Sequence, residues 1–333
     1  MSSPTPVQSL IAGLCLALPV HFLKVLNGNV FGISGFLHRA VRGSKEALVA
    51  VSGLVVGGVI VGLTERTGQR PIVDLRRTLV ASLLVGFGTK LSNGCTSGHM
   101  VCGVSRLSLR SIVATGTFFI TGVITAALVH NDLPASHSAD WSLGPYGKTF
   151  LVLQTIPLAI LLSLYYYASS DVDCKPEVQQ SEETPLLQSA SPQILFRRLT
   201  FLAASVEFAL ALRLSGLTDP VRVVSFLLLP FHRAFDVSLA FLALGVLPLS
   251  ILLYKYTRGS EKPRLGGEWA IPKGGEIDAN LLVGAAIFGV GWGLAGICPG
   301  PGLVNLGRAL VTGTGLMHHL TWAAGVVIGG LLA

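Results

Sequence analysis

Charged side chains are scarce in this 333-residue chain: Asp, Glu, Lys and Arg together make up 12% of it, whereas hydrophobic residues make up 51%. A water-soluble domain of this size could not bury so much apolar surface, so the composition excludes an ordinary soluble protein. The chain also lacks a nucleotide-binding motif of the Gly-x-x-x-x-Gly-Lys type, which argues against a built-in ATPase motor. Its formal charge of +7 comes from basic residues in loops between apolar runs, without a continuous basic stripe, so nucleic-acid binding is not expected.

Cysteine is also sparse, and its distribution excludes a disulfide scaffold. Of the five cysteines, Cys15, Cys95 and Cys298 lie inside or beside apolar runs, and Cys174 lies in a polar stretch. No spacing typical of a secreted disulfide framework appears, so any functional cysteine is expected to act as a thiol. The first apolar run has neither a basic leader region nor a clean cleavage site, so we interpret it as a mature helix and not as a signal peptide.

Apolar runs long enough to cross a bilayer dominate the chain. A spanning helix needs roughly 20 mostly apolar residues, and about nine runs approach that length. They cover residues 8–26, 46–64, 78–94, 110–129, 149–168, 198–215, 236–256, 280–297 and 316–333. Four further runs are too short or too rich in Gly and Pro to cross, which is typical of re-entrant half-helices. They cover residues 28–40, 96–107, 218–230 and 299–312. The expected fold is an all-α polytopic membrane protein with about nine transmembrane helices and four short broken or re-entrant helices.

A Gly-rich stretch recurs in the second half of the chain. Four of its residues return in the same order, displaced by 203 positions: Gly86, Gly88, Leu91 and Cys95 match Gly289, Gly291, Leu294 and Cys298. A Ser-Gly pair upstream also recurs, as Ser34-Gly35 and Ser215-Gly216. An odd number of expected spans separates the starts of the two repeats, so we expect halves of opposite orientation. Such an inverted internal repeat would bring both cysteines toward a shared cavity near the bilayer midplane.

We divide the chain into three parts. Residues 1–168 form the first transport repeat with a connecting helix, residues 169–195 form a disordered polar linker, and residues 196–333 form the second transport repeat. Residues 182–187 resemble an acidic dileucine signal, which would recruit cytosolic sorting adaptors. The distribution of Lys and Arg favours the linker side as cytoplasmic, so we expect the N-terminus outside, in the plasma membrane or in an internal, vacuolar-type membrane.

The first break in the helices is expected to form a seat for an anion. The stretch Gly94-Cys95-Thr96-Ser97-Gly98-His99 ends one helix and begins another, because Thr and Ser are favoured at helix N-caps. The N-terminus of a half-helix offers free N–H groups with partial positive charge, where anions bind. Lys90 lies in an otherwise apolar run, so it is expected to face a cavity or a negative partner, with a structural, snorkelling role as the alternative.

The second break is rich in proline. Pro cannot continue a helix interior but is favoured at the first helical position, so a new half-helix is expected near Pro301, with Arg308 about two turns further on. A thiol is a polarizable weak donor that suits a soft sulfur atom, whereas N–H groups and cations suit an oxyanion. The two breaks therefore predict a site for a small anion that carries both sulfur and oxygen. The expected substrate-binding residues are Cys95, Cys298, Gly94, Thr96, Ser97, Gly98, His99, Pro299, Gly300, Pro301, Ser34, Gly35, Ser215, Gly216, Lys90, Arg106 and Arg308.

These motifs resemble the YeeE/YedE sulfur-transport family, which includes bacterial thiosulfate importers. The matching segments are 94–99 and 288–301, together with 32–35 and 214–220, and the resemblance is to two half-length members joined end to end. It implies an hourglass fold of about thirteen helices, nine of them spanning. It also implies that thiols at the positions of Cys95 and Cys298 pass thiosulfate along by S–H···S hydrogen bonds. The importers carry a further cysteine where this chain has Ser34, so a shorter relay, or a related substrate such as sulfite, sulfide or a persulfide, stays open.

Other interpretations stand beside this one. Cys95, His99 and Cys102 place three soft ligands within eight residues, but structural zinc needs four, so we expect neither a metal nor a cofactor. Gly-x-x-x-Gly spacings such as those around Gly86 and Gly289 are also typical of helix packing. The rival function is a membrane-bound sulfur-relay protein that carries a covalent cysteine persulfide, which would need a thiolate exposed to water. We expect a transporter and not an enzyme.

Overall fold

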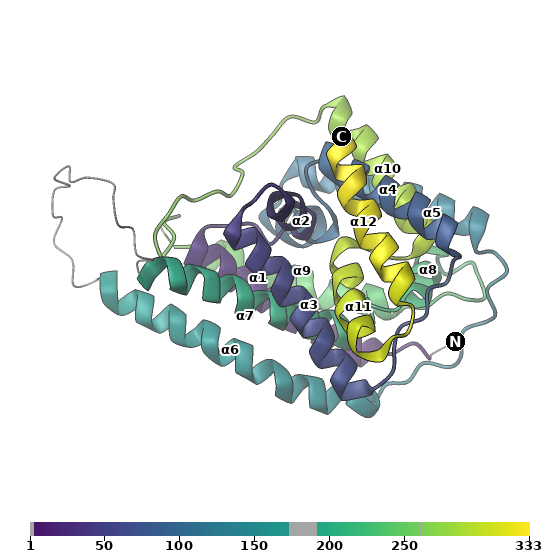
Figure 1. Cartoon of the computed structure of the whole chain (residues 1–333), viewed down its shortest axis with the longest axis horizontal. Coiled ribbons are helices and arrows are strands. Elements are labelled where there is room, and N and C mark those ends of the chain that lie inside the picture. Colours follow the sequence, from purple (N-terminus) through teal and green to yellow (C-terminus); the bar gives the residue numbers. More distant parts are fainter. Residues whose placement is uncertain (1–2, 173–191, 260) are drawn as a thin grey trace.

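The computed structural model describes residues 3–172, 192–259 and 261–333, and within these ranges the regular secondary structure is entirely helical (Figure 1). Both ends of the predicted linker 169–195 are helical, because one helix continues to Val172 and the next begins at Pro192. Cys174 and the dileucine-like segment 182–187 lie outside the described residues.

The helices follow the apolar runs of the sequence. The first half contains α1 (Pro6–Asn27), α2 (Ile33–Val41), α3 (Lys45–Glu65), α4 (Leu75–Leu91), two short segments η1 (Ser97–Gly103) and η2 (Val104–Arg106), and α5 (Leu109–Val129). The rest contains α6 (Gly144–Val172), α7 (Pro192–Leu214), α8 (Pro220–Leu227), α9 (Ser238–Thr257), α10 (Ala279–Ala295), α11 (Pro299–Thr312) and α12 (Leu316–Leu332). Ser44, Asp74 and Asp278 accept hydrogen bonds from backbone N–H groups in the first turns of α3, α4 and α10, so these helix starts are encoded locally.

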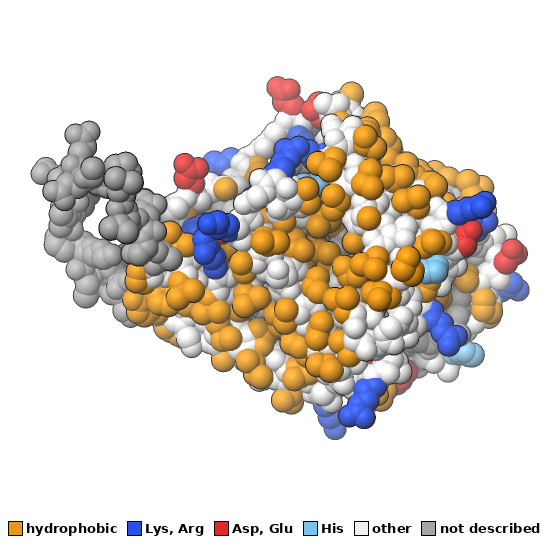
Figure 2. All heavy atoms as spheres, viewed as in Figure 1, with side chains coloured by type: hydrophobic (Ala, Val, Ile, Leu, Met, Phe, Trp, Pro, Cys, Tyr) orange, Lys and Arg blue, Asp and Glu red, His pale blue; other side chains and the backbone are white. Residues whose placement is uncertain are grey.

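Six helical stretches of the described chain are long and apolar enough to cross a membrane. They are Pro6–Asn27, Lys45–Glu65, Leu109–Val129, Gly144–Ala168, Ser238–Thr257 and Ala279–Thr312, the last of which contains α10 and α11. The predicted count of nine is not confirmed, because α4 and α12 have 17 residues each and α7 carries several charged residues. Hydrophobic side chains nevertheless cover most of the face seen in Figure 2, and the chain is an integral, multi-pass membrane protein.

Helices of the two halves pack against each other in a reciprocal pattern (Figure 1). α1 packs against α9 while α3 packs against α7, and α4 packs against α12 while α10 packs against α5. α1 also packs against α7, and α4 packs against α10. The contacts are therefore symmetric between the halves. α1 corresponds to α7, α3 to α9, α4 to α10 and α5 to α12, and each of these contacts has its counterpart under this exchange. The opposite orientation of the two halves stays a prediction.

The repeated glycines lie where helices of the two halves approach closely. A Cβ atom on Gly88 of α4 would lie 2.6 Å from the backbone oxygen of Gly284 in α10, and one on Gly291 of α10 would lie 2.7 Å from the backbone oxygen of Ala81 in α4. No side chain fits into such a contact, so these helices pack backbone to backbone. Other glycines face backbone in the same way: Gly86 against α12, Gly289 against α5 and Gly293 against α5.

Candidate functional site

Three cavities follow one another along α1, a helix of 22 residues and roughly 33 Å. At its start, Thr5 and Gln8 line a cavity of about 320 Å³ that also contains Glu65, here called the Glu65 cavity. Near its middle, Leu16 lines a cavity of about 220 Å³, the cysteine cavity. Just beyond its end, Asn29 lines a cavity of about 400 Å³, the basic cavity. The small central cavity therefore lies between two larger ones at opposite ends of the same helix.

The cysteine cavity brings Cys95 and Cys298 together. The two side chains are 1% and 2% exposed, and both line this one cavity although they belong to different halves of the chain. Four more of the predicted site residues also line it: Thr96, Ser97, Gly300 and Pro301. Apolar side chains make up most of the remaining wall, among them Leu16, Ile33, Phe119, Phe208, Phe226 and Trp292. The cavity is therefore a dry, apolar space with two thiols and two hydroxyl groups.

Each thiol has a hydroxyl neighbour. The Cys95 Sγ atom lies 3.3 Å from the Ser97 Oγ atom, and the Thr96 side chain lies beside the Cys298 thiol. The Ser97 hydroxyl also accepts a 3.1 Å hydrogen bond from the backbone N–H of Ile33, which ties the start of α2 to the start of η1. These contacts fix the orientation of both sulfur atoms toward the same cavity.

Both cysteines stand directly before short helices. Thr96 is the N-cap of η1, as the sequence predicted, and Cys298 is the N-cap of α11. α11 begins at Pro299, two residues before the predicted Pro301, and both prolines lie in its first turn, for which Pro is well suited. Since neither proline has an N–H group, Gly300 supplies the free donor of this turn, and the second break offers an anion fewer donors than the first.

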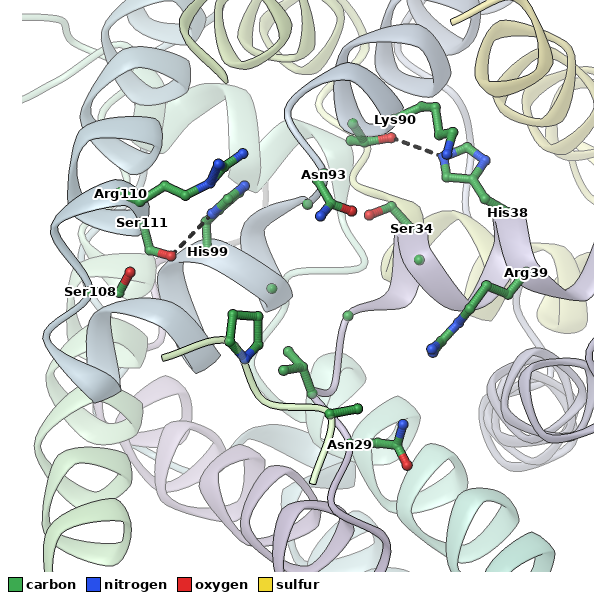
Figure 3. A pocket seen from close by; sticks show the side chains of 18 of the residues that line it. Asn29, Ser34, His38, Arg39, Lys90, Asn93, His99, Ser108, Arg110 and Ser111 are labelled. Carbon is green, nitrogen blue, oxygen red and sulfur yellow. Dashed lines mark hydrogen bonds between the residues drawn. The ribbon is translucent and has the colours of Figure 1, made fainter. Parts of the chain in front are cut away.

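The basic cavity is lined by five cations, and among its described lining residues none is Asp or Glu. Figure 3 labels three of the cations, Arg39, Lys90 and Arg110. The cations are Arg39, Arg42, Lys90, Arg106 and Arg110. Seven predicted site residues belong to this cavity and not to the cysteine cavity: Ser34, Gly35, Lys90, Gly94, Gly98, His99 and Arg106. A concave site with charges of one sign attracts the opposite charge, so this mouth of the protein concentrates anions.

Several buried polar atoms in the basic cavity have no hydrogen-bond partner among the described residues. The Ser34 hydroxyl is 1% exposed and has no hydrogen-bond partner among the described residues, and the same holds for the buried Nε and Nη1 atoms of Arg106. In Figure 3 the Ser34 and Asn93 side chains point toward each other across the cavity. Buried donors without partners are costly, so a bound oxyanion would satisfy groups that the protein leaves open.

His99 is held by the protein itself. Its Nδ1 atom lies 3.2 Å from the Ser111 Oγ atom, and its Nε2 atom lies 3.2 Å from the Ser92 carbonyl oxygen (Figure 3). With both ring nitrogens engaged, His99 supports the break between α4 and η1, so a further hydrogen bond to a substrate would require one of these to break.

Comparison with known proteins assigns the chain to a family. Residues 12–125 match the sulphur transport family, and residues 196–333 match a family of unknown function, DUF6691. A "Probable transporter" of Xylella fastidiosa (strain 9a5c) is 40% identical over 126 residues, which are 92% of that protein and 36% of this chain. Another "Probable transporter" of the same strain is 34% identical over 138 residues, 92% of its length and 41% of this chain. The chain belongs to the YeeE/YedE sulfur-transport family. It is a membrane transporter, and it joins two family units in one chain.

In this YeeE/YedE transporter the remaining predicted residues line neither the cysteine cavity nor the basic cavity. Arg308 forms an ion pair with Glu65 and donates a 2.6 Å hydrogen bond to the Thr67 carbonyl oxygen, at the Glu65 cavity. Ser215 is fully buried and donates to the Leu212 carbonyl oxygen. Gly216 lines the Glu65 cavity, and Pro299 is the first residue of α11. Arg308 and Gly216 therefore lie at the Glu65 cavity, whereas Pro299 adjoins Cys298.

Two acidic residues of the YeeE/YedE transporter are not among the site residues that the sequence predicts. Glu65 ends α3 and lies between Arg213 and Arg308, and Glu207 lies in the middle of α7. Both could have been predicted from their position, because an ionisable residue inside or at the end of a spanning run is rare unless it has a function or a charged partner.

Proposed function

We propose that this transporter carries thiosulfate, or a related small sulfur-containing anion, through the cysteine cavity, with Cys95 and Cys298 as its contacts. One observation supports this most strongly: two thiols from different halves of the chain line one buried cavity that lies between two larger polar ones. A binding site at mid-depth with an opening toward each face is the arrangement that alternating access requires.

The chemistry of the cysteine cavity fits an anion with two unlike ends. The terminal sulfur of thiosulfate is large, polarizable and weakly hydrated, so it suits apolar walls and S–H donors. The hydroxyl groups of Thr96 and Ser97, with the free amide of Gly300, suit the oxygen end. A dry cavity with so few donors holds an anion weakly, which favours passage over storage.

The basic cavity attracts the anion at one mouth. Its five cations draw anions toward it, and the unused groups of Ser34 and Arg106 can hold an oxyanion next to the break at Gly94 and Gly98. With the N-terminus outside, as we propose, this mouth opens on the cytoplasmic side and the Glu65 cavity opens on the outer side.

The geometry argues against a covalent persulfide carrier. Such a carrier needs a thiolate that meets a partner at an aqueous face, whereas both thiols are buried within apolar walls where a thiolate is costly. Hydrogen bonding through the neutral S–H group avoids that cost. Mass spectrometry after exposure to thiosulfate separates the two functions: unmodified Cys95 and Cys298 support the transporter, and a stable added sulfur on either supports the carrier.

The decisive test is a flux measurement with purified protein. Proteoliposomes that contain the wild-type chain are expected to take up labelled thiosulfate, and Cys95→Ala and Cys298→Ala are expected to abolish this uptake. Cys15→Ala is the matched control, because Cys15 lies on α1 outside the three cavities and its loss is expected to leave uptake intact. Uptake by both alanine variants at the wild-type rate would remove the thiols from the mechanism.

A further inference from the structure

Three carboxylates are buried within the described residues, and two of them are paired with arginine. Glu65 lies between two arginines, and Asp236 lies 3.4 Å from Arg222. The third, Glu207, is 0% exposed, and neither of its carboxyl oxygens has a hydrogen-bond partner among the described residues. An ionised carboxylate without a partner is very costly in a low-dielectric interior, so burial at this position favours the neutral, protonated form.

The register of α6 against α7 places Glu207, in the second half of α7, toward α6. The two helices pack antiparallel, because Gly147 near the start of α6 lies against Leu214 at the end of α7, and a ring contact joins their opposite ends. Glu207 precedes Leu214 by seven residues and therefore lies on the same face of α7. Gln154 follows Gly147 by seven residues on α6, so the register of the pair places Glu207 and Gln154 at the same level.

Gln154 offers the acceptor that a protonated Glu207 needs. Its side chain is buried, its Nε2 atom donates a 3.0 Å hydrogen bond to the Phe150 carbonyl oxygen, and its Oε1 atom has no partner among the described residues. A protonated carboxyl group can donate its O–H to this amide oxygen. An ionised Glu207 carboxylate beside the Gln154 Oε1 atom would place two hydrogen-bond acceptors together without a donor. A single proton bound to Glu207 would supply that donor and satisfy both side chains.

The position of Glu207 links it to the cysteine cavity. The Cys15 thiol of α1 lies close enough to interact electrostatically with the Glu207 carboxyl group. The next residues along these two helices, Leu16 and Phe208, line the cysteine cavity. Any shift of α1 against α7 that accompanies filling of the cavity therefore also changes the surroundings of the carboxyl group.

Few other ionisable groups face this carboxyl. Of the elements packed against α7, α1 presents Cys15 at this level and α6 presents the uncharged Gln154. α3 has no titratable residue between Glu46 and Glu65, and the one charged residue of α11, Arg308, is paired with Glu65. No neighbouring charge therefore holds this carboxyl group in its ionised form.

A route for protons leads in from the Glu65 cavity. Gly147 and Phe150 of α6 line this cavity, and Phe150 precedes Gln154 by four residues, which is about one helical turn or 6 Å. The buried Phe150 ring packs in one apolar cluster with Leu210 and Leu214. This cluster lies between the Glu65 cavity and the level of Glu207 and Gln154.

We propose that Glu207 is a proton-binding site that couples the movement of the anion to the movement of a proton. The carboxylate takes a proton from water in the Glu65 cavity, on the side where the anion enters, shares it with the Gln154 Oε1 atom, and returns it to water on the side of the basic cavity, where the anion leaves. No electrons are exchanged. Each proton that accompanies a divalent anion such as thiosulfate cancels one of its two charges. The coupling rests on the proposed function, whereas the proton site itself does not.

Infrared spectroscopy tests the proton site without any substrate. Purified wild-type protein at neutral pH is expected to show the carbonyl band of a protonated carboxylic acid, and Glu207→Gln is expected to lose it. Glu46→Gln is the matched control, because Glu46 forms an ion pair with Arg197 at 2.8 Å and its loss is expected to leave the band unchanged. A wild-type spectrum without the band, or a band that persists in Glu207→Gln, would overturn the proton site.

Transport in proteoliposomes tests the coupling. An inwardly directed proton gradient is expected to raise the initial rate of labelled-thiosulfate uptake several-fold in the wild type and in Glu46→Gln, but not in Glu207→Gln. Equal stimulation in Glu207→Gln, or none in the wild type, would overturn the coupling. A wild type that moves no thiosulfate under any gradient would defeat the proposed function and the coupling together, while the infrared band would still decide whether Glu207 holds a proton.

Discussion

Cys95 and Cys298, which are 203 positions apart in the chain, line the same buried cavity, and each thiol lies beside a hydroxyl group from the start of η1. Among the described lining residues, the hydroxyl groups all come from the first half, whereas the second half contributes Gly300 and Pro301 of α11. Two breaks that are related in sequence are therefore unequal in chemistry. The first break can bond an oxyanion through hydroxyl groups, and the second mainly shapes the cavity.

Serine in place of either cysteine separates the role of sulfur from the role of a hydrogen-bond donor. Cys95→Ser and Cys298→Ser keep a small donor of similar size but lose the polarizable atom that suits a soft sulfur. We expect each to lower the rate of thiosulfate uptake by about tenfold, equivalent to about 1.4 kcal/mol, with little change in the thermal unfolding midpoint in detergent. Uptake at the wild-type rate in both serine variants would show that a donor of any kind suffices.

Arg106 is expected to set the affinity of the basic cavity for anions. Arg106→Gln removes a cation whose buried Nε and Nη1 atoms have no partner among the described residues, so the half-saturation concentration for thiosulfate is expected to rise several-fold. Arg70→Gln is the control, because Arg70 is exposed and does not line this cavity. The same rise in both variants would mean that net charge alone attracts the anion.

Much of the fold follows from local features of the sequence, because apolar runs mark helices and Gly, Pro, Ser and Thr mark their ends. The meeting of Cys95 and Cys298 at one cavity also follows from the sequence, since the two residues hold equivalent positions in the internal repeat. The division of the predicted site residues among three separate cavities cannot be predicted in this way, because it depends on contacts between residues that are distant in the sequence. Arg308 was predicted to meet the substrate, but its partner Glu65 lies 243 positions earlier in the chain, and no local pattern reveals such a pair.

The pairing of Arg308 with Glu65 predicts a structural role for this arginine. Arg308→Met removes one of the two cations beside a buried carboxylate, and breaking a buried ion pair typically costs about 3–5 kcal/mol. We expect a large fall in the thermal unfolding midpoint in detergent, and a smaller one for Arg308→Lys, which keeps the charge but not the hydrogen bonds to Thr67. If Arg308 contacts the substrate instead, Arg308→Lys will raise the half-saturation concentration while the unfolding midpoint stays at the wild-type value.

The contact between α4 and α10 predicts a sharp difference among glycines that look alike in the sequence. A methyl group on Gly88 or Gly291 would overlap backbone atoms of the facing helix, so Gly88→Ala and Gly291→Ala must push the helices apart, at a cost of about 1–3 kcal/mol each. Gly116 of α5 is the control, because a methyl group there has no atom within 4 Å. Gly116→Ala is expected to stabilise the protein by up to about 1 kcal/mol, since Ala loses less backbone entropy than Gly in a helix. The unfolding midpoints of the three variants are compared with that of the wild type in one detergent, with tryptophan fluorescence as the probe. Equal shifts of the midpoint in all three variants would contradict backbone-to-backbone packing of the two halves.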